Sequence, residues 1–209
     1  MRKHIGRNIA LIVLLVLFAA GVLWFCGGET NVGGPVISYA VMFPEDLYKE
    51  ARLVVTGRYL GDERVYGQKD AGRPVTVGKL EVETVYKGET ESKTIPIRFY
   101  GGTISLREHY AAYSWGGDER SLKEFIKEIP AWVYISRLGS KYTEKYDTQV
   151  DAQKGQEYLL FLSFDEEAGV YQVLSDAYGM RLLDENGKAY DPDSRSYQSL
   201  PAFLTEAQK

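Results

Sequence analysis

Few side chains in this sequence could carry out chemistry, and a single histidine is the first of them. His109 is the one histidine beyond the N-terminal apolar segment. A zinc site built from several histidines is therefore excluded in that part, and any catalytic triad would have to use His109. Ser105 and Ser114 lie nearby, but neither sits in the G-x-S-x-G turn that exposes a nucleophilic serine. We predict no catalytic residue.

Aromatic residues gather around this histidine and are the main candidates for binding. His109, Tyr110, Tyr113 and Trp115 precede the pair Gly116-Gly117. Aromatic faces on a loop bordered by glycine can stack on sugars or anchor a partner protein, because they combine a large contact area with a polar tip. The alternative is that Tyr110 and Tyr113, at helical spacing, pack on the body of the domain.

Two acidic stretches suggest metal binding or hydrolysis at first sight. The segment Asp184 to Asp193 has four acids and an asparagine, but Gly187 stands at its fourth position, whereas a calcium-binding EF-hand loop needs glycine at the sixth. We therefore predict a hairpin with a type I′ turn at Asn186-Gly187. The run Asp165 to Glu167 is interpreted as a solvated turn rather than a pair of catalytic carboxylates. No metal site or cofactor is predicted, since glycine-rich phosphate loops are also missing.

The N-terminus indicates where the chain works. Arg2, Lys3 and Arg7 precede the segment 9–26, which has no charged side chain. About eighteen apolar residues at a rise of about 1.5 Å each can just cross the hydrocarbon core of a membrane. Basic residues tend to stay on the cytoplasmic side, so everything after Cys26 is predicted to be extracytoplasmic.

Three fates of this segment remain open. A lipoprotein signal would attach lipid to Cys26, yet Trp24 and Phe25 occupy places where that signal has small residues. Ordinary cleavage could follow Ala19 to Gly21, which form an A-x-A-like site and would give a secreted protein. An uncleaved signal anchor agrees with the length of the span and with Trp24 at the membrane interface, and we favour it.

Charge and composition limit the partners of the outward part. Residues 27–209 contain 22 basic and 29 acidic side chains, because three of the 25 basic residues precede them, and their net charge is −7. Such a surface does not neutralise phosphates, so nucleic acid is not expected as a partner. Residues 27–42 are interpreted as a glycine-rich tether and 43–209 as one domain, which has no cysteine and hence no internal disulfide.

Local patterns predict alternating short elements in this domain. Pro44 with two acids opens a short helix, and alternating apolar residues indicate strands. Pro96 argues that its strand lies at an edge or a bulge, because proline cannot donate to a ladder. The expected elements are a helix from 44, strands at 52–61, 79–86 and 95–99, a loop at 62–74, a capped helix at 121–129 that Pro130 ends, a strand at 131–136, a polar loop to 154, a doubly covered strand at 158–162, a turn at 165–169, a strand at 170–175, hairpin strands at 180–184 and 188–191, and a C-terminal helix within 200–207.

The order of several segments carries a resemblance. The stretches "KEARLVVTGRYLG", "LEVETVYKG", "IPIRFYGG", "GQEYLLFL" and "GVYQV" resemble uncharacterised secreted or membrane-anchored bacterial proteins and, more distantly, are similar to the netrin-like module of metalloproteinase inhibitors. This resemblance implies a mainly β fold, a small antiparallel OB or netrin-like barrel or sandwich with two or three peripheral helices. Those inhibitors bind zinc through an N-terminal cysteine held by disulfides, and no cysteine follows Cys26 here, so their activity is not carried over.

The expected function is therefore non-enzymatic. We expect a membrane-tethered extracytoplasmic binding module for a protein or a cell-wall component such as a glycan. The alternative is an envelope enzyme, or a regulator of one, with its site around His109. The ligand itself does not follow from the sequence.

Overall fold

The computed structural model describes residues 43–69, 72–112, 141–144 and 152–208. The expected membrane segment with Cys26, the tether, and the elements predicted at 121–129 and 131–136 lie outside these ranges. None of the described helices is long and apolar enough to cross a bilayer. The described residues fall into two compact units. The small unit contains 67–69, 72–73, 103–112 and 141–143, and the larger unit contains 43–66, 74–102, 144 and 152–208.

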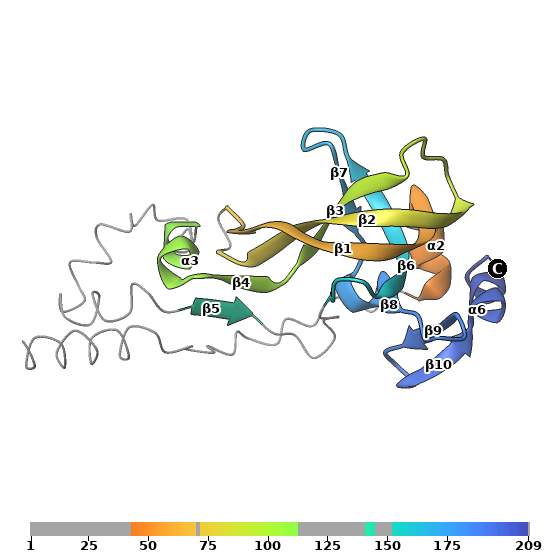
Figure 1. Ribbon diagram of the computed structural model, residues 1–209. Coiled ribbons are helices and arrows are strands. Elements are labelled where there is room, and N and C mark those ends of the chain that lie inside the picture. Colours follow the sequence, from red (N-terminus) through yellow and green to blue (C-terminus); the bar gives the residue numbers. More distant parts are fainter. Residues whose placement is uncertain (1–42, 70–71, 113–140, 145–151, 209) are drawn as a thin grey trace, which may run out of the picture. The chain divides into compact units, whose positions relative to one another are not determined.

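A mixed six-stranded sheet forms the centre of the larger unit (Figure 1). The strand order is β1-β2-β3-β7-β6-β8, and β1 also pairs with β6. The prediction of a mainly β protein is confirmed. The prediction that the sheet is antiparallel is wrong, because β3 and β7 run parallel. The strands are β1 (Leu53–Gly67), β2 (Pro74–Lys87), β3 (Thr94–Tyr100), β6 (Glu157–Asp165), β7 (Val170–Val173) and β8 (Met180–Leu182).

Strand β6 lies at the middle of this sheet, as its apolar run predicted. It pairs antiparallel with β1, where Leu53 faces Leu162, and with both β7 and β8. Each residue from Tyr158 to Leu162 is at most 1% exposed. A strand buried on both faces needs no polar alternation, which explains the continuous apolar sequence.

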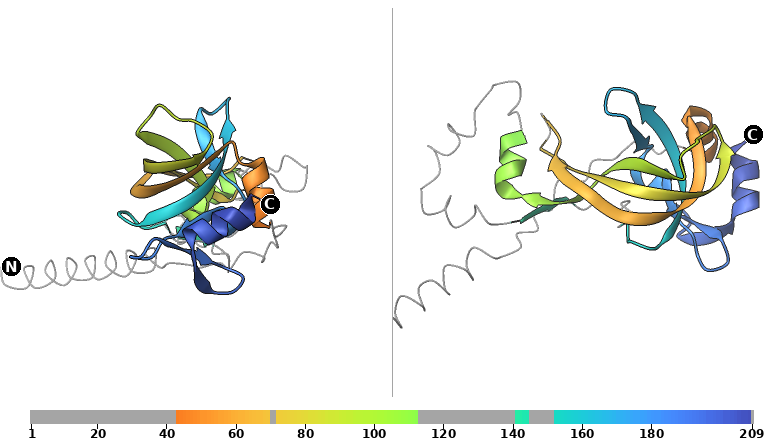
Figure 2. Two further views of the ribbon diagram at one scale, coloured as in Figure 1. Left: turned by 90° about the vertical axis from the view of Figure 1, so that its right-hand side faces the viewer. Right: turned by 45° about the horizontal axis from the view of Figure 1, so that its top comes forward.

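Two apolar clusters cover the two faces of β6. Leu160 and Leu162 belong to the first cluster, which lies among the strands, whereas Leu159 and Phe161 belong to the second. The second cluster also contains residues of α2 (Pro44–Glu50) and α6 (Leu200–Ala207), which lie side by side against the sheet (Figure 2). The helices predicted at both places are confirmed.

Between β7 and β8 the chain interrupts its regular pairing with β6 and then resumes it. The N–H of Phe161 donates to the carbonyl of Gly179 at 2.8 Å, and its own carbonyl accepts from the N–H of Leu174 at 3.0 Å. The residues between them form a short 3-10 helix, η1 (Asp176–Tyr178), all of it buried. This excursion places Tyr178 next to the start of β8 and hence beside Arg181.

Three local predictions need correction. Strand β1 continues to Gly67 instead of ending at 61, so the loop before β2 is limited to residues 68–73. The reason is that the second half of β1 is exposed or half-buried and contains polar residues, which resemble a loop in sequence. Pro96 lies in an interior strand, tolerated because β7 pairs only with Ile97 and Arg98 of β3.

The turn at Asn186-Gly187 is also of another type than predicted. A type I′ turn needs positive φ at both central residues, yet within this turn only Gly187 has positive φ, at 68°. The N–H of Gly187 donates to the carbonyl of Asp184 at 2.9 Å, and the N–H of Asp184 donates to the carbonyl of Lys188 at 3.0 Å. This pattern is a three-residue hairpin loop that ends with glycine in the left-handed region.

The small unit contains a two-stranded sheet and one described helix. Strand β4 (Gly102–Ser105) pairs with β5 (Lys141–Glu144), and their hydroxyls at Thr103 and Thr143 lie 2.8 Å apart. Helix α3 (Leu106–Ala112) follows β4 directly. The sequence predicted a polar loop where β5 lies, because this short strand gives little apolar signal: among the three of its residues whose burial is described, Tyr142 alone is buried.

Candidate functional site

The ring of His109 is held by contacts within the small unit. Its ring stacks on that of Tyr142, with centroids 3.8 Å apart and planes 22° from parallel. Its Nδ1 lies 2.7 Å from the carbonyl oxygen of Gly72, so a proton on Nδ1 is donated there. Ser105, the neighbouring hydroxyl, accepts the backbone N–H of Glu108 at 3.1 Å, which is the bond of a helix N-cap. These contacts hold α3 in place.

The other aromatic candidates are not brought to a described site. Tyr110 belongs to α3, but its side chain lies outside the described part, as do Tyr113 and Trp115 as whole residues. Cys26 likewise falls outside it. The predicted binding role of these residues therefore stays a prediction.

The acidic segments form turns, in which aspartate side chains accept backbone N–H groups. Asp165 accepts the N–H groups of Glu167 and Ala168 within its turn and forms an ion pair with Arg98 at 2.8 Å. The N–H of Ala168, followed by the Arg98 guanidinium, holds the pKa of Asp165 below its ordinary value. Within the described ranges, no group of three or more histidine, cysteine, aspartate or glutamate side chains is placed to hold a metal ion.

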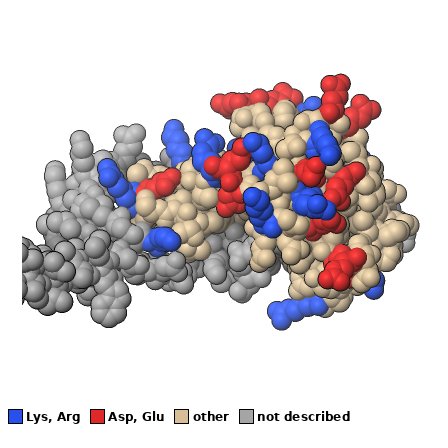
Figure 3. Space-filling view, in the orientation of Figure 1, with Lys and Arg blue, Asp and Glu red and all other residues tan. Residues whose placement is uncertain are grey.

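Paired charges cover the strands on the side shown in Figure 3. Acidic and basic side chains lie intermingled there over β1 and β2. Arg58 contacts Glu157 at 2.8 Å and Glu83 at 3.4 Å, and Lys93 contacts Glu81 at 2.9 Å. Because opposite charges alternate, this surface presents no broad field of one sign to a ligand.

The hairpin of β9 and β10 differs from this charged surface, because one of its faces packs on the core and the other faces solvent. Strand β9 (Lys188–Asp191) pairs antiparallel with β10 (Ser196–Ser199). Alternate side chains of a strand point to opposite faces, and paired residues share a face. The inner face therefore carries Ala189, Asp191, Ser196 and Gln198, and the outer face carries Lys188, Tyr190, Tyr197 and Ser199.

The inner face is fastened to the core. Ala189 is 1% exposed and belongs to the second apolar cluster, while its neighbour Leu183 forms a single bridge with it. Beside Ala189, Asp191 forms an ion pair at 3.1 Å with Arg181 of β8, a side chain that is only 2% exposed. A hairpin of two strands is marginally stable alone, so these contacts hold it in place.

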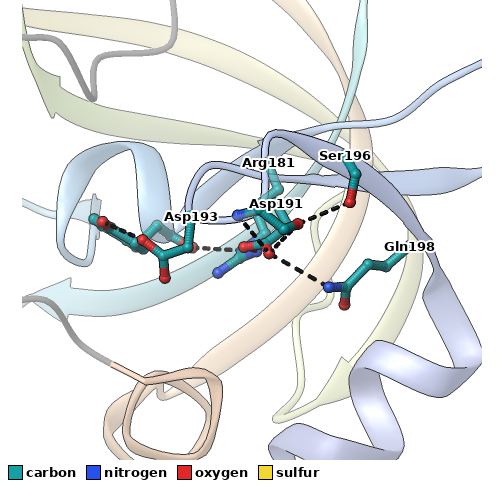
Figure 4. A network of polar contacts seen from close by, with 7 residues as sticks. Arg181, Asp191, Asp193, Ser196 and Gln198 are labelled. Carbon is teal, nitrogen blue, oxygen red and sulfur yellow. Dashed lines mark hydrogen bonds and ion pairs between the residues drawn. The ribbon is translucent and has the colours of Figure 1, made fainter.

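A network of polar contacts surrounds this ion pair (Figure 4). The second carboxylate oxygen of Asp191 accepts the Ser194 hydroxyl at 2.6 Å and the amide of Gln198 at 3.3 Å. The Nε of Arg181 donates to the carbonyl of Tyr178 at 2.9 Å, and its guanidinium lies 4.4 Å from the ring centroid of Phe203 in α6. The buried cation is thus contacted from three elements, η1, β9 and α6.

The charges of the network follow from these contacts. Burial lowers the pKa of the Arg181 guanidinium, and the carboxylate of Asp191 opposes that effect. Burial also acts to raise the pKa of Asp191, but the bonds from Ser194 and Arg181 outweigh it and hold that pKa below its ordinary value. Both groups are therefore charged at neutral pH. The Tyr178 hydroxyl donates to Asp193 at 2.8 Å and adds a link to the loop of the hairpin.

The outer face carries two tyrosines, of which Tyr197 is exposed and Tyr190 is half-buried. The rings of Tyr190 and Tyr197 lie 5.4 Å apart at 62°, an edge-to-face contact, and Tyr197 is 43% exposed. Lys188 and Ser199 form the next pair along the same face, and both are exposed. Sequence reasoning missed this face because it paired the strand of Lys188 to Asp191 with the preceding segment 180–184 and predicted no strand at 196–199. The pattern that indicates this pair of strands is the alternation of residues within "KAYD" and within "SYQS", two segments separated by a polar loop.

No protein-family model matches this sequence, and no curated protein matches it either.

Proposed function

We propose that the chain is a membrane-tethered extracytoplasmic binding module, with its binding surface on the outer face of the β9–β10 hairpin. The observation that carries this proposal is the contrast between the two faces of the hairpin. Asp191 and its network fix the inner face, while Tyr197 stands exposed on the other. An exposed aromatic side chain on a rigid support suits recognition, because little conformational entropy is lost on binding.

The fold of this module is proposed to be an OB or netrin-like barrel. Support comes from the pairing, since β1, β2, β3, β7 and β6 each pair with the next and β6 pairs back to β1. A closed order of five strands is what such a barrel requires. Small barrels of this kind host binding sites of many chemistries, so the fold itself assigns no ligand.

The location rests on the N-terminal segment. Basic residues before the apolar run favour a cytoplasmic N-terminus and an extracytoplasmic domain. The rival hypothesis, an envelope enzyme or regulator acting through His109, gains no support from the contacts of that residue, because its ring is engaged by Tyr142 and Gly72.

Photo-crosslinking in intact cells tests the proposal. Tyr197 is replaced by p-benzoylphenylalanine in the full chain, and Tyr66 of β1, a half-buried tyrosine next to Arg64, is replaced in the control. We expect a discrete adduct with an envelope component from position 197 and none from position 66. Equal labelling at both positions, or none at 197, would refute the proposed surface.

A further inference from the structure

We infer that Asn186 is a site of spontaneous deamidation, and that the isoaspartate formed there loosens the β9–β10 hairpin. This modification is independent of the proposed function, because it needs no ligand and takes place in the loop that leads into β9. Three observations carry it: the glycine that follows Asn186, the exposure of both residues, and the hydrogen bonds of their loop.

Asn186 and Gly187 supply both reacting groups. When hydroxide removes the amide proton of Gly187, the nitrogen can bond to Cγ of Asn186, and the side-chain amide leaves as ammonia with a proton from water. Glycine has no Cβ to crowd the attacking nitrogen. The succinimide ring then takes up water at either of its carbonyls. One product is aspartate, and the other is isoaspartate, in which the main chain runs through Cβ and Cγ.

Solvent reaches both residues of this pair. Asn186 and Gly187 are exposed, and a Cβ placed on Gly187 would meet no atom within 4 Å. The other asparagines of the chain, Asn8 and Asn31, are each followed by a β-branched residue, whose side chain crowds the nitrogen that would attack. Asn186 is therefore the asparagine at which deamidation should be fastest.

The hydrogen bonds of the loop slow the reaction while the hairpin is closed. The attacking nitrogen belongs to Gly187, whose N–H donates to the carbonyl of Asp184 at 2.9 Å. The carboxylate of Asp184 accepts the N–H groups of Asn186 and Lys188 at 2.9 and 2.8 Å. Deamidation therefore proceeds from the molecules in which the loop is open. Breaking the bond from Gly187 alone should make the reaction about fivefold slower than in an unstructured peptide.

The two products differ in their effect on the hairpin. Aspartate keeps the length of the main chain and adds a charge at an exposed position. Isoaspartate adds an atom to the main chain of a three-residue loop, so Asp184 and Lys188 lose the register in which they are bonded at 3.0 Å. The bridge between Leu183 and Ala189 follows directly, and Ala189 is buried in the second apolar cluster. A displacement there loosens the inner face of the hairpin.

The test follows the full-length protein in detergent micelles during storage in mildly alkaline buffer. Trypsin cuts after Arg181 and Lys188, so Asn186 lies in the peptide 182–188, whose mass rises when the amide becomes a carboxylate. We expect aspartate and isoaspartate forms of this peptide to accumulate, about fivefold more slowly than in the synthetic peptide 182–188. Asn186→Gln is the matched control, because its amide would have to close a larger ring, and it should stay unmodified.

Hydrogen–deuterium exchange measures the loosening. The acidic fraction from anion-exchange chromatography, in which isoaspartate predominates, should exchange the amides of β9 and β10 about tenfold faster than the unmodified protein. Asn186→Asp has the same charge on an ordinary main chain and should exchange like the wild type. Stored protein with no more product at position 186 than Asn186→Gln would refute the site. An acidic fraction that exchanges like Asn186→Asp would refute the loosening.

Discussion

At the scale of residues, the buried guanidinium of Arg181 explains why the hairpin has a fixed position. Removing a cation from water is costly, and the structure compensates with a carbonyl, a carboxylate and an aromatic face. Such a pair adds little net stability compared with apolar residues of the same volume. Its effect is on geometry, because only one arrangement of the hairpin satisfies the charge of Arg181.

Removing the carboxylate should therefore destabilise the protein strongly. Asp191→Ala leaves a cation that is 2% exposed without its counterion, and we expect the free energy of unfolding to fall by about 3 kcal/mol or more. Urea unfolding followed by circular dichroism measures this change. Glu185→Ala, an exposed acid in the adjacent turn, is the matched control and should change stability by less than about 0.5 kcal/mol. A loss below about 1 kcal/mol for Asp191→Ala would contradict the anchoring role.

The same carboxylate should make stability depend on acid pH. The pKa of Asp191 is lower in the folded chain than in the unfolded chain, so its contribution is present above the unfolded pKa and is lost as the pH falls through the folded pKa. Stability should decline below about pH 4. Asp165 and Asp184 titrate in the same direction, so the comparison with Asp191→Asn isolates this group. The variant should show a shallower acid limb, and parallel curves would argue against the assignment.

At the scale of elements, the near approach of β1 and β2 depends on a glycine. A Cβ added at Gly78 would lie 2.2 Å from the hydroxyl oxygen of Tyr59, a residue that is 1% exposed. The ring of Tyr59 occupies the space that a side chain at position 78 would need, and its hydroxyl donates to Asp62. Burial, followed by this bond to Asp62, raises the pKa of Tyr59, so the phenol stays neutral.

Gly78→Ala should therefore destabilise the larger unit through overpacking. We expect a loss of about 1–3 kcal/mol in the free energy of unfolding, because the Tyr59 ring must leave its rotamer or the strands must separate. Combining Gly78→Ala with Tyr59→Leu removes the clash, so the double variant should be more stable than the sum of the two single losses predicts. Additive losses, measured by urea unfolding, would show that the two residues do not share one space.

Helices and strands with a strong apolar pattern could be predicted from the sequence. Strands that are stabilised mainly by pairing with a neighbouring strand could not. The run Tyr158 to Leu162 indicated the central strand because burial on both faces leaves no other pattern. The far half of β1 and the short β5 were missed because exposed strands are stabilised by pairing, which local composition does not encode. Tyr197 was missed for the same reason, since only the register with Tyr190 shows that the two share a face.

At the scale of the whole molecule, the proposed anchor limits where the hairpin can act. Sixteen residues, 27–42, separate Cys26 from Phe43, where the described chain begins. Fully extended, they reach at most about 55 Å. A module held in this way would bind ligands close to the outer surface of the membrane.

The anchor itself is tested by the fate of the full-length chain in its own cells. We expect an unmodified N-terminus at Met1, retention in the membrane pellet after an alkaline wash, and release by detergent. Leu14→Arg combined with Leu15→Arg puts two charges at the centre of the apolar run, each unfavourable by about 2.5–3.5 kcal/mol in a membrane, and should abolish retention. Glu185→Ala serves as the control and should remain in the pellet. A chain that starts at Cys26 with attached lipid would make this a lipoprotein despite Trp24, and a start near Val22 in the medium would remove the tether from the mechanism, because a secreted module is no longer confined to the membrane surface.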